Sequence, residues 1–257
     1  MIGVFDSGLG GLSVIREVLA LDPSASILYL GDRDWAPYGE RSLEEVQGRA
    51  EAITRYLIAK GADSIVIACN TASAAALHHL RKIHPDRTFV GMEPAVKPAV
   101  ALTRSGTIGV LATPATFQGA LYASVVDRFA IDVEVIDAPC PGWMELVEDP
   151  PGHAEIRSAI ESNLGPILDH GADVLVLGCT HYPFLRDHIE AVAGPDVTIV
   201  DPGEAVARQV IRMADTQGRA GLRILVTGPT TGVSERIRAL TGLDLSVESV
   251  TFDDSDT

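Results

Sequence analysis

The sequence predicts an α/β protein of two pseudo-symmetric lobes, each with a mostly parallel sheet, and an active site in the cleft between them. The first observation is an internal repeat, because residues 60–73 read KGADSIVIACNTAS and residues 170–183 read HGADVLVLGCTHYP. Glycine, aspartate and cysteine keep the same positions in both strings, so Cys69 corresponds to Cys179. The second observation is that short aliphatic runs alternate with helical periodicities, which is typical of parallel sheets covered on both faces.

The repeat continues outside the cysteine strings. IGVFDS at residues 2–7 is echoed by IGVLAT at 108–113, and MEP at 92–94 is echoed by VDP at 200–202. The matches occur in the same order in both halves. This order indicates two structural units related by an approximate two-fold axis.

Strands are expected where Val, Ile and Leu run together between turn residues. These runs are residues 2–5, 27–30, 64–68, 88–91, 107–111, 133–136, 174–177, 197–200 and 223–226. Apolar residues recur with helical spacing in the intervals, at residues 12–21, 43–60, 72–83, 95–103, 117–129, 154–169, 184–193, 204–215 and 234–240. Each predicted strand is therefore followed by a predicted helix.

The last strand and helix, residues 223–240, have no counterpart in the second half of the repeat. We expect this unit to return to the first lobe. The predicted lobes are residues 1–95 plus 204–257, and residues 96–203.

Composition excludes several classes of protein. At 257 residues, 46% of them hydrophobic, the chain can bury a sizeable core. A formal net charge of −15 argues against a nucleic-acid partner or an anionic membrane surface, because both would repel it. No apolar run approaches the roughly 20 residues that cross a bilayer, and the chain opens with a strand in place of a signal segment. A cytoplasmic protein is expected.

The three cysteines, an odd number, fit reduced thiols better than a disulfide framework. Cys140 is interpreted as a small buried apolar residue. Cys69 and Cys179 each follow a strand and precede a helical segment, where ligands bind in parallel sheets and a helix N-terminus favours thiolate by less than about one pKa unit. Two such thiols facing each other could take a proton from one face of a carbon and return one to the other, titrating as a coupled pair.

Polar residues adjoin both thiols and the end of the first strand. They are Asp6 and Ser7, Asn70 and Thr71, and Thr180 and His181. These side chains could hold the carboxylates and ammonium of an amino acid, with Asp6 and His181 assisting proton transfer at the neighbouring thiols.

Two other kinds of site are disfavoured. Gly8, Gly10 and Gly11 follow neither phosphate-binding pattern, so we interpret them as a tight strand-to-helix turn. Cys69, Cys179 and His181 lack the closely spaced ligand pairs of a zinc site, and no metal is expected.

A pyridoxal cofactor is also disfavoured. It would need a buried Schiff-base lysine, and the chain has only Lys60, Lys82 and Lys97. Lys60 and Lys82 lie near predicted helix ends, away from the strand tips. We therefore expect no cofactor.

Several longer strings carry a family resemblance. They are IGVFDSGLGGLSV at 2–14, GD at 31–32 with PYG at 37–39, IACNTASA at 67–74, PCP at 139–141 with LVE at 146–148, and LGCTHYPFL at 177–185. In these strings the chain resembles the glutamate racemases, which are cofactor-independent amino-acid racemases.

The resemblance implies interconversion of L- and D-glutamate, supplying D-glutamate for peptidoglycan, with Cys69 and Cys179 as the two acid/base residues. It suggests that Cys69 serves D-glutamate and Cys179 serves L-glutamate. It also implies a homodimer and an assisting carboxylate at Glu148. The substrate contacts it implies are Asp6, Ser7, Tyr38, Gly39, Asn70, Thr71, Thr180 and His181.

Other functions stay open at this point. Aspartate or hydantoin racemases and maleate isomerases share the two-cysteine chemistry, and only substrate assays discriminate among them. A related decarboxylase would be expected to use one cysteine. A two-lobed binding protein for an anionic amino acid would explain the lobes and polar strand tips, but gives no reason for two matched thiols.

Overall fold

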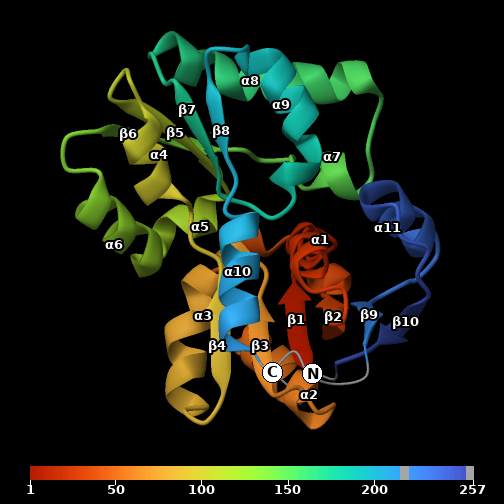
Figure 1. The fold of residues 1–257 in the computed structure, drawn as a ribbon. Coiled ribbons are helices and arrows are strands. Elements are labelled where there is room, and N and C mark those ends of the chain that lie inside the picture. Colours follow the sequence, from red (N-terminus) through yellow and green to blue (C-terminus); the bar gives the residue numbers. More distant parts are fainter. Residues whose placement is uncertain (215–219, 253–257) are drawn as a thin grey trace.

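The computed structural model describes residues 1–214 and 220–252, which form two sheets flanked by helices (Figure 1). The larger sheet has the strand order β10-β9-β2-β1-β3-β4, and the smaller has the order β6-β5-β7-β8. All of these pairings are parallel. The predicted α/β class with two mostly parallel sheets is confirmed.

The strands lie close to where aliphatic runs predicted them. In the larger sheet they are β1 Ile2–Asp6, β2 Ser26–Gly31, β3 Ser64–Ile67, β4 Thr88–Gly91, β9 Gly221–Thr227 and β10 Val247–Val250. In the smaller sheet they are β5 Thr107–Ala112, β6 Glu134–Pro139, β7 Val174–Leu177 and β8 Thr198–Val200.

Helices fill the connections. They are α1 Leu12–Leu21, α2 Leu43–Ala59, α3 Asn70–Ile83, α4 Val96–Leu102, α5 Pro114–Gln118, α6 Ala120–Phe129, α7 Glu145–Glu148, α8 His153–Asp169, α9 Arg186–Ala193, α10 Gly203–Met213 and α11 Val233–Thr241. Three 3₁₀ turns join them, η1 Arg33–Trp35, η2 Tyr38–Glu40 and η3 Tyr182–Leu185. Among the described residues, no helix is both long and apolar enough to span a bilayer.

Each sheet has an apolar core on both faces, because successive strand residues point to opposite sides. Ile2 and Val4 of β1 pack against α1, α10 and α11, whereas Phe5 packs against α2 and α3. In the smaller sheet Val110 packs against α4 and α6, and Leu111 against α8 and α9. With both faces covered, the carboxyl ends of the strands are left to form a site.

The chain crosses to the smaller sheet and comes back. Strand β9 pairs with β2, so the final strand and helix join the larger sheet as the repeat suggested. The lobe boundaries at 95/96 and 203/204 stay a prediction.

Several elements differ from expectation, among them helix α7 and the turns η1 and η2, which were not predicted. Strand β10 was not predicted, because its edge position leaves Glu248 and Ser249 exposed among the apolar residues. The helix expected at 117–129 is two helices, α5 and α6, divided at Gly119, where a Cβ would lie 2.6 Å from that of Ala74. The expected helix at 184–193 begins as the 3₁₀ turn η3. The predicted end of α10, residue 215, lies outside the described residues.

Candidate active site

The ends of four strands, two from each sheet, meet at a cavity of about 200 Å³. Ser7 follows β1, Cys69 follows β3, Thr113 follows β5 and Cys179 follows β7. Most of the residues named from the sequence line this cavity, namely Ser7, Tyr38, Gly39, Cys69, Asn70, Thr71, Cys179, Thr180 and His181. Asp6 and Glu148 do not line it, but they hold residues that do.

A larger cavity of about 630 Å³ lies elsewhere, between α3, α4, α6 and α10. It contains no cysteine or histidine, and its lining mixes apolar residues with both charge signs. The smaller cavity is the better candidate for chemistry, because both repeat thiols and His181 open onto it.

Cys69 occupies a buried position at the start of α3. The Ala72 N–H donates to its sulfur at 3.4 Å, and the thiol lies 3.8 Å from Ser7 Oγ. Burial, followed by the neighbouring Asp6 carboxylate, raises the pKa of the Cys69 thiol despite the Ala72 hydrogen bond. The Ala72 N–H at the helix terminus lowers this pKa, as expected, but desolvation and Asp6 outweigh it, so the net shift is upward.

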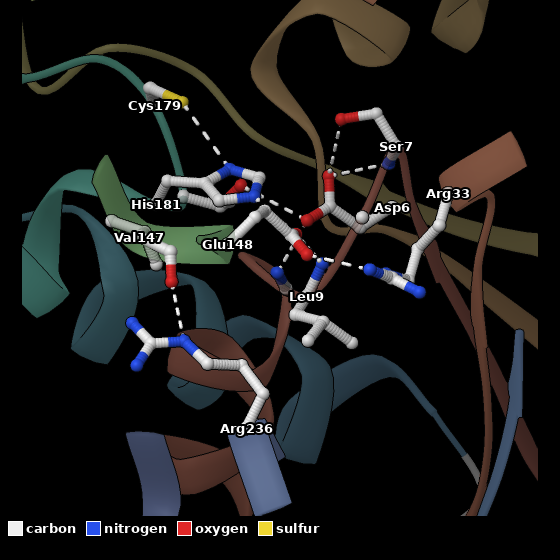
Figure 2. Close-up of polar contacts among 12 residues, drawn as sticks. Asp6, Ser7, Leu9, Arg33, Val147, Glu148, Cys179, His181 and Arg236 are labelled. Atoms are coloured by element: carbon white, nitrogen blue, oxygen red, sulfur yellow. Dashed lines mark hydrogen bonds and ion pairs between the residues drawn. The ribbon is translucent and has the colours of Figure 1, made fainter. Parts of the chain in front are cut away.

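Cys179 has different surroundings. No α-helix begins directly after it, because η3 precedes α9. Its sulfur instead lies 3.8 Å from His181 Nδ1 (Figure 2). The two thiols are thus equivalent in topology but have different polar partners.

His181 is fully buried and connects Cys179 to Glu148. Its Nε2 lies 3.0 Å from Glu148 Oε1, and Glu148 also accepts from the Leu9 N–H (Figure 2). Burial lowers the pKa of His181, but hydrogen bonds to Cys179 and Glu148 outweigh it and hold the pKa well above 6.5. Burial raises the pKa of Glu148, but His181, the Leu9 N–H and Arg33 outweigh it and hold that pKa below 4.5. The pair is arranged as imidazolium and carboxylate.

Asp6 lies beneath the floor of the site with no exposed surface. Its carboxylate accepts from the backbone N–H groups of Ser7 at 2.7 Å and Gly11 at 2.5 Å, and from Thr180 Oγ1 at 3.4 Å. Burial raises the pKa of Asp6, although His181 and the two N–H donors oppose the shift. The fixed carboxylate sits where it acts on Cys69 electrostatically and orders the loop at residues 7–11.

The glycines of that loop make room for the acid/base groups. A Cβ on Gly8 would lie 2.3 Å from Glu148 Oε1, and one on Gly10 would lie 2.3 Å from His181 Nδ1. The sequence indicated a tight turn here. The structure adds a reason for its glycines, which is close approach of side chains from the other lobe.

Tyr38 forms part of the cavity wall, and its phenol hydroxyl is already engaged in a hydrogen bond. Its hydroxyl donates to Asp32 at 2.6 Å, and the Asp32 carboxylate accepts in turn from Nε and Nη2 of Arg49. Gly39 follows, and a Cβ there would lie 2.8 Å from Cβ of Thr113. The 38–39 segment therefore packs directly on the other lobe.

Asn70 and Thr71 behave differently from each other. Both polar atoms of the Asn70 side chain are buried without a protein hydrogen-bond partner, beside the cavity. Thr71 Oγ1 lies 2.9 Å from Thr113 Oγ1 and 3.3 Å from Thr116 Oγ1, across the two lobes.

Thr113 and Thr116 were not predicted as site residues from the sequence, although Thr113 stands in the repeat at the position of Ser7. Arg33, which contacts Glu148, was also not predicted, because no motif or repeat in the sequence marks it as a site residue.

Cys140 also lines the cavity, although no sequence pattern indicated a functional role for it. It is buried, its sulfur lies 3.3 Å from the Ala138 carbonyl, and burial raises the pKa of its thiol. This placement fits the structural interpretation made from the sequence.

The residue types at the cavity bear on cofactors and metals. Lys60, Lys82 and Lys97 are exposed and do not line it. Within residues 1–214 and 220–252, no group of three or more His, Cys, Asp or Glu side chains is placed to hold a metal ion.

Comparison with known proteins gives the family. The model of the family described as Asp/Glu/Hydantoin racemase matches residues 12–210. The chain belongs to this family. It is therefore an isomerase of the amino-acid racemase type, and the resemblance seen in the sequence strings is confirmed.

Individual members of the racemase family are similar over most of the chain. A glutamate racemase of Pseudomonas paraeruginosa is 49% identical over 217 residues, which cover 84% of this chain and 82% of the relative. A solved glutamate racemase isoform of Bacillus anthracis has a TM-score of 0.87 at 31% identity, covering 98% and 97% of the two chains. Escherichia coli glutamate racemase, solved with L-glutamate and the activator UDP-MurNAc-ala, has a TM-score of 0.84 at 31% identity, covering 97% of each chain.

Proposed function

We propose that the chain is a glutamate racemase that needs no cofactor and uses Cys69 and Cys179 as its two acid/base residues. The observation that carries the proposal is that one cavity holds two thiols from equivalent strand ends, each with its own polar partner. The similar proteins named glutamate racemase support the choice of substrate.

The proposed reaction is one proton removal and one proton return. One cysteine, as thiolate, takes the α-hydrogen of glutamate as a proton, so that the C–H bond breaks and an S–H bond forms. The carbon keeps the electron pair. The other cysteine, as thiol, donates its proton to the opposite face, which inverts the configuration and leaves the protonation states of the thiols exchanged.

The surroundings of the two thiols differ, which supports different protonation behaviour at each before substrate binds. Cys69 has a raised pKa and therefore favours the protonated form. Cys179 faces His181, whose imidazolium can donate to sulfur and whose neutral form can accept from it. Asp6 and Glu148 are proposed to act on the two thiols through the loop at 7–11 and through His181.

Glutamate would be held by local hydrogen-bond donors. No Lys or Arg lines the cavity, and the chain has a net charge of −15, so binding cannot depend on a general positive field. Asn70 offers an unpaired buried amide, and the Thr71, Thr113 and Thr116 hydroxyls can rotate toward a carboxylate. We propose these groups, with Ser7, Tyr38, Gly39, Thr180 and His181, as the substrate contacts.

The first test is proton NMR of L-glutamate in D₂O with purified protein and no added cofactor, with circular dichroism of the same mixture. Loss of the α-proton signal together with decay of the optical signal toward zero is expected. If aspartate exchanges and glutamate does not, the two-thiol chemistry stands and the substrate is wrong. If no amino acid exchanges its α-hydrogen, a binding protein is the better description.

Three further expectations accompany the proposal. The product D-glutamate would supply peptidoglycan synthesis in the cytoplasm, which predicts rescue of a bacterial strain that requires D-glutamate for growth. A homodimer is expected from the family resemblance, and sedimentation at assay concentration tests it. Cys69 is proposed to serve D-glutamate and Cys179 to serve L-glutamate.

A further inference from the structure

We propose that Arg33 is a positioning residue for proton transfer at Cys179, acting through Glu148 and His181. This inference rests on the proposed racemase function. Arg33 is in η1, immediately after β2, and touches neither thiol. Its place is at the far end of a line of polar contacts that runs from Cys179 Sγ to His181, then to Glu148, then to Arg33 (Figure 2).

The two oxygens of Glu148 have separate partners. Oε1 accepts from the Leu9 N–H at 2.5 Å and lies 3.0 Å from His181 Nε2. Oε2 accepts from Arg33 Nε at 3.3 Å. Because the carboxylate is planar, a bond to Oε2 from the opposite side limits its rotation and keeps Oε1 facing the imidazole.

Arg33 is itself anchored. Its Nη1 donates to the Pro229 carbonyl at 3.2 Å, in the segment between β9 and α11. The guanidinium is therefore held between the C-terminal segment and Glu148, with about 29% of its side chain exposed. Partial exposure makes the residue replaceable without opening a core cavity.

The orientation of His181 depends on this carboxylate. With Nε2 engaged by Glu148, the other ring nitrogen faces Cys179 at 3.8 Å, in whichever protonation state the ring holds. If Arg33 is lost, Glu148 retains the Leu9 bond but can turn away from His181. Proton transfer at Cys179 then slows. Cys69 makes no hydrogen bond to this line of residues, since its partners in the described part of the chain are Ser7 Oγ and the Ala72 N–H.

Because only Cys179 is linked to Arg33, a measurement that treats the two cysteines separately can distinguish this role from a general structural effect. L- and D-glutamate have equal free energies in water, so any variant must lower kcat/KM by the same factor in both directions. The isotope effect of α-deuteration on kcat/KM can differ between the two directions. It reports how far removal of the α-hydrogen, by the cysteine that deprotonates that enantiomer, limits the rate. Slower transfer at Cys179 should raise the isotope effect for the enantiomer that Cys179 deprotonates and reduce it for the other.

The experiment compares wild type with Arg33→Met, Arg33→Lys and Arg236→Met, using L- and D-glutamate with hydrogen or deuterium at the α-carbon. Arg33→Met is expected to lose roughly tenfold in kcat/KM and to move the two isotope effects in opposite directions, because it disturbs one acid/base partner indirectly. Arg33→Lys keeps the charge and should recover part of the loss. Arg236→Met is the matched control for loss of a nearby positive charge, since Arg236 also interacts electrostatically with Glu148 but donates its hydrogen bond to the backbone carbonyl of Val147 on the same helix and not to the carboxylate.

Several results would overturn the inference. One is an active Arg33→Met enzyme whose two isotope effects equal those of wild type, and another is an Arg236→Met enzyme that shifts them as Arg33→Met does. If Arg33→Met fails to fold by circular dichroism, Arg33→Lys decides by the same opposite shifts. A wild-type protein that exchanges no α-hydrogen of glutamate rejects the racemase proposal and this inference together, whereas an active wild type with unmoved variants rejects only the role of Arg33.

Discussion

At the scale of single residues, the two thiols should each be indispensable. Replacing either Cys69 or Cys179 by serine removes one of the two groups that exchange protons with the α-carbon, and a hydroxyl is a far weaker acid at neutral pH. Each variant is expected to lose about 10²- to 10⁴-fold in racemisation. Optical assays from both enantiomers measure the loss, with circular dichroism as a control for folding. Retention of activity in both variants would refute the two-base mechanism.

Gly10 offers a second residue-scale test of the same site. Alanine there would place a Cβ 2.3 Å from His181 Nδ1, so the imidazole must move away from Cys179. We expect Gly10→Ala to lower kcat/KM at least about tenfold, because it disturbs a positioned acid/base group. Gly48→Ala is the control, since nothing lies within 4 Å of its Cβ and alanine favours helix α2 by about 1 kcal/mol. Equal activity of the two variants would contradict the role given to His181.

At the scale of elements, helix α7 is joined to His181, at the start of η3, by a buried ion pair whose stabilisation depends on pH. The pKa of Glu148 is lowered on folding, so its contribution is present above 4.5 and is lost as pH falls through the folded value. The pKa of His181 is raised, so its contribution is complete below 6.5 and is lost as pH rises through the folded value. The pair therefore stabilises the protein most between pH 4.5 and 6.5, where both contributions are complete.

Glu148→Gln tests this pH window. Wild type should exceed the variant in free energy of unfolding by about 1–3 kcal/mol near pH 6, because the buried imidazolium loses its charged partner. The difference should narrow in more acidic and in more alkaline solution. Urea unfolding followed by circular dichroism across this range measures it, and a difference independent of pH would show that the pair is not ionised.

The helices, strands and turns also show which features could be predicted from the sequence and which could not. Local sequence pattern predicts the strand ends, the positions of both thiols and the 7–11 turn. An aliphatic run bounded by glycine and polar residues indicates a strand and a turn whatever the rest of the chain does. Gly119 divides α5 from α6 because of Ala74 in the other lobe, and Arg33 meets Glu148 across 115 residues of sequence. Thr116 joins the site through its neighbour Thr113 and, from the other lobe, through Thr71. Such contacts depend on how the lobes pack, which no local pattern encodes.

At the scale of the whole molecule, the site is formed where the two lobes are bonded together. Ser13 Oγ donates to the Thr180 carbonyl at 2.9 Å, Thr71 meets Thr113, and Glu148 accepts from the Leu9 N–H. The repeat therefore yields more than two similar halves. Each half supplies one thiol together with its nearest polar side chain, Ser7 for Cys69 and His181 for Cys179, and the hydrogen bonds between the halves bring the two thiols to one cavity.

The charge of the whole chain gives the last prediction. With a net charge of −15, the protein repels glutamate, which is also an anion at neutral pH, before local donors can act. The range of this repulsion falls from about 30 Å at 0.01 M salt to about 8 Å at 0.15 M. KM should therefore decrease about two- to threefold over that range, since the effect acts on encounter, while kcat stays constant because the long-range repulsion does not act on the chemical step. Initial rates at matched pH in sodium chloride, with sucrose as an uncharged control, measure this. A KM that rises with salt would mean that a local positive field dominates binding, and would contradict the proposal that glutamate is held by hydrogen-bond donors in a cavity without Lys or Arg in its lining.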